Sequence, residues 1–582
     1  MKHNKTIALA LLAITSLLLS GSTPVGSGLL ERELAKLTQR GLTYRIADGS
    51  DCSTCGKGQW VEVYDLHAAL TDRFPLGPLL TPREPKYTGL PTLTIDLGTI
   101  DTNQYAWKYH YLTSIPVVGY DGFPLPGGDT DNNGLTEVYG IYQTMGIFQT
   151  RIYELSDSSM WVYRYAYPSR TGSVDDLDDI DANGLKELYT RFGDSLLVFE
   201  QASPTTLPTV SKFQFRQWYF QSTGIPNHLA DMDGNGRKEL VYSGSVADSQ
   251  QNSIRKSMVA RYDSSLNNLR PVWEKQFPPG CVDYCTGQLA TGDFDADGKM
   301  EFVTSGYEGQ VYVVEHVDAD SFEVVWTDSL VAAGRVTAGD VDGNGIEEFF
   351  VGAPYVEPDG YAHIRLYAYE RTGNNQYQPV FVFNIFPVCL FFVESFHTVD
   401  MVGDSTKELL LAFSGGVLII KGTGPHSYSV FFFKSVSSLE SMAGIDVDRN
   451  GTKELLVSRL TNTQEVYSWT HVFALDSVAA AVGGDPLLPI RASLLQSYPN
   501  PFNLSTTLSF DLPEPSDVSL VVYDVLGRKI IELAKGSHGA GTHTAIWDAN
   551  EQASGVYLAR FTVTGSDGEM KYSNVNKLVL MK

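Results

Sequence analysis

The sequence predicts an all-β protein in which a seven-bladed β-propeller precedes a small antiparallel β-sandwich. Two periodic features predict the propeller. An acidic motif of the form Asp-x-Asp-x-Asn-Gly-x-x-Glu recurs seven times, and neighbouring copies begin 46 to 62 residues apart. A large aromatic residue precedes each copy by 13 to 22 residues. Repeats of this length are typical of solenoids, propellers and arrays. Short alternating apolar segments after residue 495 predict the sandwich.

β-rich segments connect the acidic motifs. Those that follow the copies at Asp293 and Asp340 are 301–305, 309–315, 322–326, 348–351, 364–369 and 380–383. With the strand that leads into each motif, they make four short strands per repeat, which is the composition of one propeller blade. The predicted propeller covers residues 95–480.

The periodic aromatic residues are expected to mark the outer strand of each blade and to pack between blades. They are Trp107, Trp161, Trp218, Trp273, Trp326, Phe381 and Phe431. After the last motif, Trp469 falls where a third strand is expected, and no clear fourth strand follows. We therefore expect the segment 105–112 to complete the last blade, because this pairing joins the propeller's ends and removes an open sheet edge.

The acidic motif has the residue types and spacing of a calcium-binding loop. Ca²⁺ takes about six to eight oxygen ligands, which acids or Asn at positions 1, 3, 5 and 9 can supply while Gly at position 6 permits a sharp turn. Mg²⁺ suits the loop less well, because it prefers octahedral geometry and retains water. The predicted ligands in the six well-formed copies are Asp129, Asp131, Asn133, Glu137, Asp179, Asp181, Asn183, Glu187, Asp231, Asp233, Asn235, Glu239, Asp293, Asp295, Asp297, Glu301, Asp340, Asp342, Asn344, Glu348, Asp446, Asp448, Asn450 and Glu454.

The motif also shares features with an EF-hand loop and with an ordinary turn. An EF-hand loop places its Glu at position 12, whereas this motif places Glu at position 9 and continues into a β-rich run, so it is not an EF-hand. Asp, Asn and Gly also form ordinary turns, which explains a single copy as well as calcium does. The seventh copy, at Asp400, departs from the pattern. Val402 and Ser405 replace its second Asp and its Gly, and we expect it to bind weakly or not at all.

The copies resemble FG-GAP/VCBS repeats, similar to those of the integrin α-subunit head and of many bacterial surface proteins. The resemblance covers about residues 95–475 and is specific because the motif repeats in register. It implies a seven-bladed β-propeller with calcium-binding loops on one face.

The N-terminus has the features of a secretory signal peptide over residues 1–22. Lys2 and Lys5 supply positive charge, residues 7–19 form an apolar core, and residues 20–22 are small. The apolar core is too short to span a bilayer comfortably. We expect no transmembrane segment in the mature chain.

The segment 23–94 has no evident role. We expect a short helix at 29–39 and an irregular chain over 40–95. Five cysteines are too few for a disulfide scaffold. A CxxC pair can form a redox or metal site, but in a secreted chain a local disulfide is commoner. The expected arrangement is a pair of Cys52 with Cys55, a pair of Cys281 with Cys285, and a buried thiol at Cys389.

After a linker at 481–495, residues 496–582 carry five short motifs in a fixed order. They are Tyr-Pro-Asn-Pro-Phe-Asn at 498–503, Tyr-Asp-Val-Leu-Gly-Arg at 523–528, Trp-Asp at 547–548, Ser-Gly-Val-Tyr at 554–557 and Lys-Leu-Val-Leu-Met-Lys at 577–582. The order resembles the type A sorting domain of the type IX secretion system, although Leu504 stands where that family often has Pro. The resemblance implies recognition by that machinery, export through the periplasm to the outer surface of a Gram-negative bacterium, and removal of the domain. An ordinary β-sandwich is the alternative.

The formal net charge of −25 makes nucleic acid and anionic membranes poor partners. Each acidic loop brings three or four carboxylates, so six bound Ca²⁺ ions would offset 12 of these charges. The predicted ion sites therefore account for most of the acidity.

The sequence leaves two function classes open, since it contains no nucleophile elbow, HExxH motif or phosphate loop. One is an extracellular binding or adhesion protein with a protein or glycan ligand. The other is a secreted polysaccharide-active enzyme, a lyase or hydrolase, on a calcium-stabilised propeller. The alternation of Tyr163, Tyr165 and Tyr167 suits either a sugar-stacking surface or an ordinary half-exposed strand. An enzyme should gather titratable groups in one central pocket, whereas a binding protein should present a broad face.

Overall fold

The computed structural model describes Leu34, residues 43–48, 59–64 and 70–75, and then, with short gaps, residues 81–476, 493–494 and 502–581. The longest gaps within these ranges are 216–226 and 277–288. The chain divides into two compact units, Met1–Leu475 and Asp476–Lys582. The predicted signal peptide, Trp107, Trp218 and the four cysteines expected to pair lie outside the described residues.

Seven sheets follow one another along the described part of the first unit, and each contains one acidic motif. In chain order, their strands are β6 (Gly127–Gly128), β7 (Glu137–Thr144), β8 (Ile147–Leu155) and β9 (Trp161–Ala166); β10 (Val174–Asp178), β11 (Glu187–Phe192), β12 (Ser195–Gln201) and β13 (Pro208–Phe215); β14 (Asn227–Ala230), β15 (Glu239–Ala247), β16 (Ser253–Asp263) and β17 (Asn268–Gln276); β18 (Leu289–Gly292), β19 (Glu301–Ser305), β20 (Gln310–Asp318) and β21 (Ser321–Ser329); β22 (Arg335–Gly339), β23 (Glu348–Val356), β24 (Ala362–Gly373) and β25 (Gln376–Phe386); β26 (Ser395–Val399), β27 (Glu408–Phe413), β28 (Gly416–Gly424) and β29 (Ser427–Ser435); and β30 (Leu439–Ile445), β31 (Glu454–Leu460), β32 (Ser468–Leu475) and β5 (Tyr109–Ile115).

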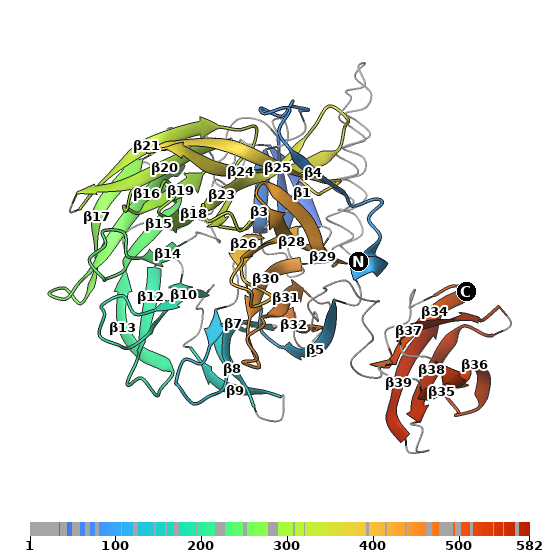
Figure 1. Cartoon of the computed structure of the whole chain (residues 1–582). Coiled ribbons are helices and arrows are strands. Elements are labelled where there is room, and N and C mark those ends of the chain that lie inside the picture. The colour runs from blue at the N-terminus through green and yellow to red at the C-terminus, as the bar shows by residue number, and fades with distance from the viewer. Residues whose placement is uncertain are drawn as a thin grey trace. The chain divides into compact units, whose positions relative to one another are not determined.

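The sheets are built alike and lie in a propeller-like arrangement. The acidic motif connects the first strand of each sheet to the second, and the motif glutamate is the first residue of that second strand. Figure 1 shows β14, β18, β26 and β30 near the middle of the unit and β13, β17 and β21 at its rim. Each sheet packs on both faces against its neighbours, so a second strand such as β23 is buried at every position. Such a strand needs apolar residues on both faces, as its Phe349-Phe350-Val351 run provides.

The seventh sheet takes its fourth strand from the beginning of the unit. β5 pairs with β32 in antiparallel register, with Ile115 opposite Thr470. One apolar cluster then joins Ile115 and Ile445 of this sheet to Val138 of the first sheet. The predicted pairing is therefore confirmed, with the strand beginning at Tyr109 because residues 102–105 form a 3₁₀ turn (η2, Thr102–Tyr105) instead.

The strand predictions within the repeats agree with the structure. All six predicted segments after Asp293 and Asp340 lie in β19 to β21 and β23 to β25, apart from Gly309 at one edge. The described aromatic markers, from Trp161 in β9 to Phe431 in β29, lie in the fourth strand of their sheets, and Trp469 lies in the third strand of its sheet. Two periodic signals in the sequence thus identify the strand order correctly.

The prediction of an irregular chain over 40–95 is wrong. A three-stranded antiparallel sheet is formed by β1 (Thr43–Asp48), β2 (Gln59–Tyr64) and β3 (Leu70–Pro75), and β4 (Thr92–Asp96) adds to β25 as a parallel fifth strand. Val61 of β2 and Leu34, the one described residue of the expected helix, are buried in a cluster with Phe383. The β-branched and aromatic residues of β2 favour a strand, but their partner strands are not marked by any repeat. Cys389 is buried in the same cluster, as expected.

The second unit consists of two antiparallel sheets around one core. They are formed by β33 (Ser493–Leu494), β34 (Ser505–Leu512) and β37 (Gly541–Asp548), and by β36 (Lys529–His538), β35 (Ser516–Asp524), β38 (Gly555–Thr564) and β39 (Met570–Leu580). Because β33 lies within the predicted linker, strand pairing in this unit begins before residue 496. Across the described residues of both units, the structure contains no helix long and apolar enough to cross a membrane.

The C-terminal motifs have structural roles in this unit. Trp547, Tyr557 and Phe502 pack together in the core with Leu578 and Leu580. In the Tyr-Asp-Val-Leu-Gly-Arg motif, the Asp524 carboxylate accepts hydrogen bonds from the backbone N–H groups of Leu526 and Arg528 and from the Arg528 guanidinium. The motif is therefore the turn between β35 and β36.

Candidate metal centre

All seven acidic loops share one hydrogen-bonded frame. The carboxylate at position 1 accepts the N–H groups of positions 5 and 6 at 2.7–3.3 Å, as when Asp293 accepts those of Asp297 and Gly298. The side chain at position 5 accepts the N–H of position 7. These bonds satisfy the backbone donors of a tight turn and direct its side-chain oxygens toward one centre.

Positions 4 and 6 of every loop adopt left-handed backbone conformations. At position 6 the φ angles are 89° for Gly134, 85° for Gly236 and 71° for Ser405. Glycine adopts such angles without steric cost, whereas a residue with a Cβ does not. This is the physical reason for Gly at position 6, and Ser405 places backbone strain in the loop that departs from the motif.

The motif glutamate is fully buried in every sheet. Its Oε2 accepts the backbone N–H of position 2 at 2.6–3.0 Å in all seven loops. Burial raises the pKa of the glutamate throughout, to about 9 for Glu301, about 8 for Glu348 and about 7 for Glu137, Glu187 and Glu454. A buried carboxylate without a counter-charge is unfavourable, so each site requires a proton or a cation.

Carboxylates from separate positions converge in these loops. Asp293, Asp295, Asp297 and Glu301 each place an oxygen within 4.8 Å of the others. Comparable groups form from the predicted aspartates and glutamates of the loops at Asp129, Asp179 and Asp231. Several hard oxygen donors around one point are the donor set that Ca²⁺ prefers. The predicted Asn ligands are partly engaged, since Asn133 Oδ1 already accepts the N–H of Leu135.

The other glutamate oxygen, Oε1, has different surroundings from sheet to sheet. In Glu137, Glu301, Glu408 and Glu454 it is buried and accepts no hydrogen bond from the described residues, although in Glu408 it lies 3.0 Å from the Lys421 ammonium group. In Glu348 it accepts a hydrogen bond from the Tyr428 hydroxyl group, with the two oxygens 3.1 Å apart. In Glu187, Glu239 and Glu408 it contacts the side chains of Lys212, Arg261 and Lys421, respectively.

The third strand of each sheet adds a residue that the sequence interpretation missed. Strand register places Glu154 opposite Glu137, Glu200 opposite Glu187, Arg261 opposite Glu239 and Glu315 opposite Glu301. By the same register, Glu370, Lys421 and Ala474 face Glu348, Glu408 and Glu454. In the sequence, each of these residues occupies the third-strand position opposite the motif glutamate. That position can be identified only once the pairing register of the strands is known.

A turn from the following sheet closes two of the loops. The Asn375 N–H donates to Asp295 Oδ2 at 2.6 Å, and its side-chain amide donates to Glu315. One sheet further on, the His426 N–H donates to Asp342 Oδ2 at 2.6 Å, and its Nε2 lies 2.9 Å from Glu370. Each of these sites is therefore built from two neighbouring sheets.

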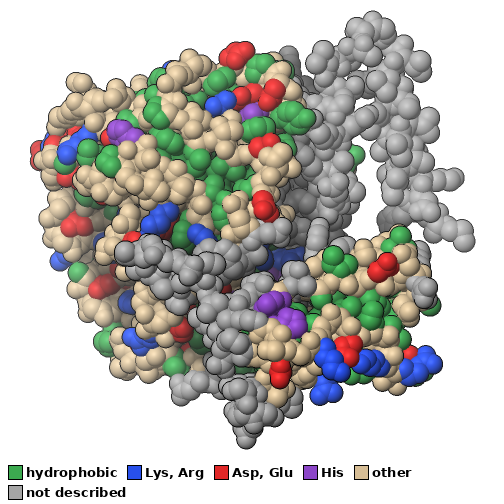
Figure 2. All heavy atoms as spheres, turned by 45° about the vertical axis from the view of Figure 1, so that its right-hand side comes forward, with side chains coloured by type: hydrophobic (Ala, Val, Ile, Leu, Met, Phe, Trp, Pro, Cys, Tyr) green, Lys and Arg blue, Asp and Glu red, His purple; other side chains and the backbone are tan. Residues whose placement is uncertain are grey.

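Comparison with known families identifies the second unit. Residues 496–573 match the family described as the secretion system C-terminal sorting domain. The C-terminal unit is a type IX secretion sorting domain. Its presence indicates secretion or surface localisation through that machinery. The sorting domain carries exposed basic side chains, including Arg528, Lys529 and Lys535, and Figure 2 shows Lys and Arg gathered along one edge of it.

The remaining comparisons are distant. No curated protein matches the chain. Solved structures with weak similarity include BBS1N in complex with ARL6DN (TM-score 0.40, 11% identity, 64% of this chain and 98% of that one). A fungal alcohol oxidase in complex with copper has a TM-score of 0.38 and 11% identity, covering 81% of this chain and 100% of that one. A putative 6-phosphogluconolactonase from Bacteroides uniformis has a TM-score of 0.36 and 12% identity, covering 69% and 98%.

Proposed function

We propose that this chain is a secreted, calcium-stabilised β-propeller protein that binds an extracellular protein or glycan ligand. The sorting domain supports the extracellular location. The fold alone does not identify a function, so the remaining parts of the proposal rest on particular features of the first unit.

The seven-bladed form is supported by the sequence of sheet contacts. First strands of successive sheets touch one another from β10 through β30. The seventh sheet packs on the first through Ile445, whose side chain reaches the backbone of Gly127 in β6. A ring closed in this way leaves no unpaired sheet edge between its first and last blades.

Calcium is supported by one observation above the others. Glu301 is fully buried, its Oε1 accepts no hydrogen bond from the described residues, and three aspartates lie around it. The Oε1 atoms of Glu137 and Glu454 are likewise buried and accept no hydrogen bond from the described residues, and each of these loops carries two aspartates. In three other sheets the same atom contacts a Lys or Arg side chain, so the fold places a positive charge at this position. Ca²⁺ would supply that charge where no side chain does.

A binding role is supported by the contrast between the two ends of each sheet. The acidic loops at one end are nearly identical in length and hydrogen bonding. By contrast, the strand bounds leave between two and seven residues to connect the second strand of a sheet to its third. A constant scaffold with variable loops on one face is the usual construction of a recognition surface.

Thermal unfolding with and without chelator tests the calcium part. The mature protein should melt at a lower temperature in EGTA, regain its midpoint when Ca²⁺ is added, and respond less to Mg²⁺. An unchanged midpoint in EGTA would contradict structural calcium.

Binding screens test the recognition part. The mature chain should retain particular glycans or surface proteins in calcium, and the isolated sorting domain serves as the control. Catalytic turnover of a polysaccharide would instead favour the enzyme alternative.

A further inference from the structure

One atom of the repeated motif distinguishes the acidic loops, namely Oε1 of the motif glutamate. Its backbone neighbours are equivalent in all seven sheets, because Oε2 of the same carboxylate always accepts the N–H of position 2. The contacts of Oε1 are therefore determined by side chains that lie outside the motif.

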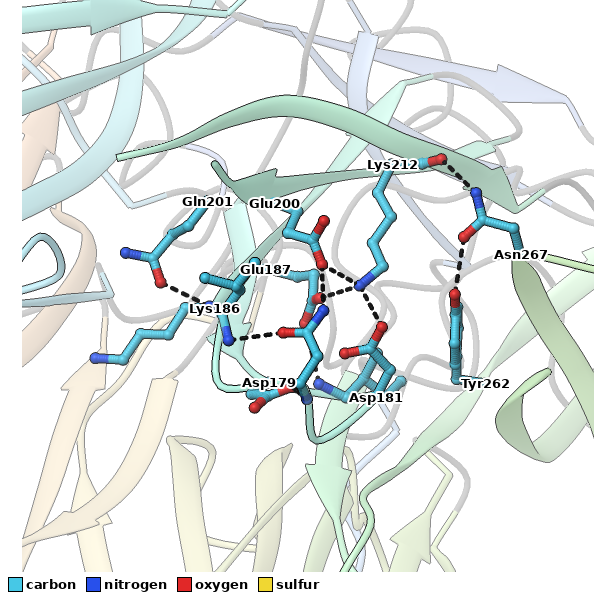
Figure 3. Close-up of polar contacts among 12 residues, drawn as sticks. Asp179, Asp181, Lys186, Glu187, Glu200, Gln201, Lys212, Tyr262 and Asn267 are labelled. Carbon is cyan, nitrogen blue, oxygen red and sulfur yellow. Dashed lines mark hydrogen bonds and ion pairs between the residues drawn. The ribbon is translucent and has the colours of Figure 1, made fainter. Parts of the chain in front are cut away.

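In the second sheet this atom meets a buried ammonium group. Lys212 of β13 has a side chain that is only 6% exposed, and its Nζ lies 2.6 Å from Asp181 Oδ2 and contacts Glu187 and Glu200. Figure 3 shows the ammonium group pointing between these three carboxylates. The Tyr262 ring of the next sheet lies 5.2 Å from Nζ on another side, so the cation is enclosed by two sheets.

In the third sheet, Oε1 of the motif glutamate also contacts a cationic side chain, here that of an arginine. Arg261 lies opposite Glu239 in the ladder, with its Nε 3.1 Å from Glu239 Oε1, and a second guanidinium nitrogen contacts Asp233. The carboxylates at positions 3 and 9 are those that a loop cation would bridge. The loop at Asp231 therefore holds a complete motif and a built-in positive charge together.

The sixth sheet combines a built-in charge with a degenerate motif. Lys421 Nζ lies 2.6 Å from Asp404 Oδ2 and 3.0 Å from Glu408 Oε1. Here the second aspartate of the motif is absent, because Val402 takes its place. The sequence alone marks this loop as weak, but it gives no such sign for the loops at Asp179 and Asp231.

We propose that Lys212, Arg261 and Lys421 act as built-in replacements for calcium, so that the loops at Asp179, Asp231 and Asp400 bind no ion. Four loops, at Asp129, Asp293, Asp340 and Asp446, then bind one Ca²⁺ each. This inference rests on the proposed calcium binding, and it reduces the number of expected calcium sites from the six predicted by the sequence to four.

The physical reason is competition for the same carboxylate oxygens. A divalent ion between Asp181 and Glu187 would face the Lys212 ammonium at short range in a site shielded from water, where like charges repel strongly. To admit the ion, Lys212 would have to leave three carboxylates. Within the described residues, no Lys or Arg contacts Glu137, Glu301, Glu348 or Glu454. Arg449 lies 3.0 Å from Asp129 Oδ2 and Lys299 lies 3.8 Å from Asp297 Oδ2, but these exposed side chains do not reach the motif glutamate, so they do not occupy the position between the glutamate and the aspartate at position 3.

Ion stoichiometry tests the proposal on the full mature chain. The protein is stripped with chelator, dialysed against Ca²⁺ and analysed for bound metal. The wild type should hold four ions. Asp233→Asn should leave the count at four, whereas its matched variant Asp295→Asn should lower it to three. Arg261→Glu, which recreates the glutamate pair of the first and fourth sheets, should raise it to five, as should Lys212→Gln.

The outcomes separate this inference from the proposal on which it rests. More than four ions in the wild type, or loss of an ion in Asp233→Asn, would contradict the proposal that side-chain cations replace calcium in these loops, and would leave calcium binding itself intact. No bound ion in the wild type, and none gained in Lys212→Gln, would overturn both. If Arg261→Glu does not fold, the Asp233→Asn and Asp295→Asn pair still decides the matter, because both variants retain Lys212, Arg261 and Lys421, and Arg261 keeps its contact with Glu239.

Discussion

Glu239 and Arg261 face each other across the β15–β16 ladder, and the guanidinium Nε lies 3.1 Å from the glutamate Oε1. The glutamate belongs to the repeated motif, whereas the arginine belongs to a strand position that the motif does not include. Removing the arginine leaves the buried Glu239 carboxylate without its counter-charge, and a broken buried pair typically costs several kcal/mol.

This pair should show strong energetic coupling. We expect Arg261→Gln to lower the free energy of unfolding in chelator by roughly 2–4 kcal/mol, because Glu239 then lacks its counter-charge. The double variant Arg261→Gln/Glu239→Gln should lose less free energy of unfolding than the two single variants lose together. Urea unfolding of all four proteins measures the difference, and additive effects would show that the two side chains do not interact.

The calcium-free protein should lose stability as pH rises. Burial, followed by the nearby Asp295 and Asp293, raises the pKa of Glu301 to about 9 from its ordinary value of 4.5. Between these values the native state binds more protons than the unfolded state, so the free energy of unfolding falls, by at most about 1.4 kcal/mol per pH unit for one group. Glu301→Gln should reduce the slope between pH 5 and pH 9 in EGTA, and an identical slope would contradict this origin. If the proposed calcium sites are occupied, the trend should reverse in the presence of Ca²⁺, because binding requires the ionised carboxylates.

Two substitutions at position 6 of the acidic loops should change the stability of the protein in opposite directions. Gly236 has a φ of 85° and open space where a Cβ would lie, so Gly236→Ala should destabilise by about 1 kcal/mol through the backbone alone. Ser405 has a φ of 71°, and Ser405→Gly should stabilise by up to about 1 kcal/mol. Thermal midpoints compare the two, and equal shifts of the same sign would count against backbone strain.

The pairing of β5 with β32 should contribute to the stability of the first unit. Ile115 is fully buried between the seventh and first sheets, so Ile115→Ala should cost about 2–5 kcal/mol. Leu112 lies in the same strand but is 39% exposed, and Leu112→Ala provides a matched control with a much smaller effect. A cost at Ile115 no larger than at Leu112 would argue that β5 does not stabilise the contact between the seventh and first sheets.

Removal of the sorting domain should block export. A chain that lacks residues 496–582 should accumulate in the periplasm, because it lacks the domain that the type IX machinery recognises. Fractionation of cells that express the full and the shortened chain measures this. Equal amounts of both chains at the cell surface would refute the requirement.

The acidic repeats show why so much of the fold can be predicted from the sequence. Their carboxylates and glycines fix a local turn whose hydrogen bonds join positions 1, 5, 6 and 7, so the turn forms from neighbouring residues in every copy. Glu301 begins β19 as the pattern predicts, and the fourth-strand aromatic residues mark the rim. The β1–β3 sheet was missed because its strands occur once and have no repeat to reveal them.

By itself the sequence determined the periodic, local features of this protein: strand order, the turn geometry of each acidic loop and the sorting domain at its end. The tertiary structure alone decided which charges meet in each loop. Lys212 and Glu187 are 25 residues apart, and Arg261 and Glu239 are 22 apart. Their contacts depend on strand register, because a shift of one residue would turn each side chain to the opposite face of the sheet.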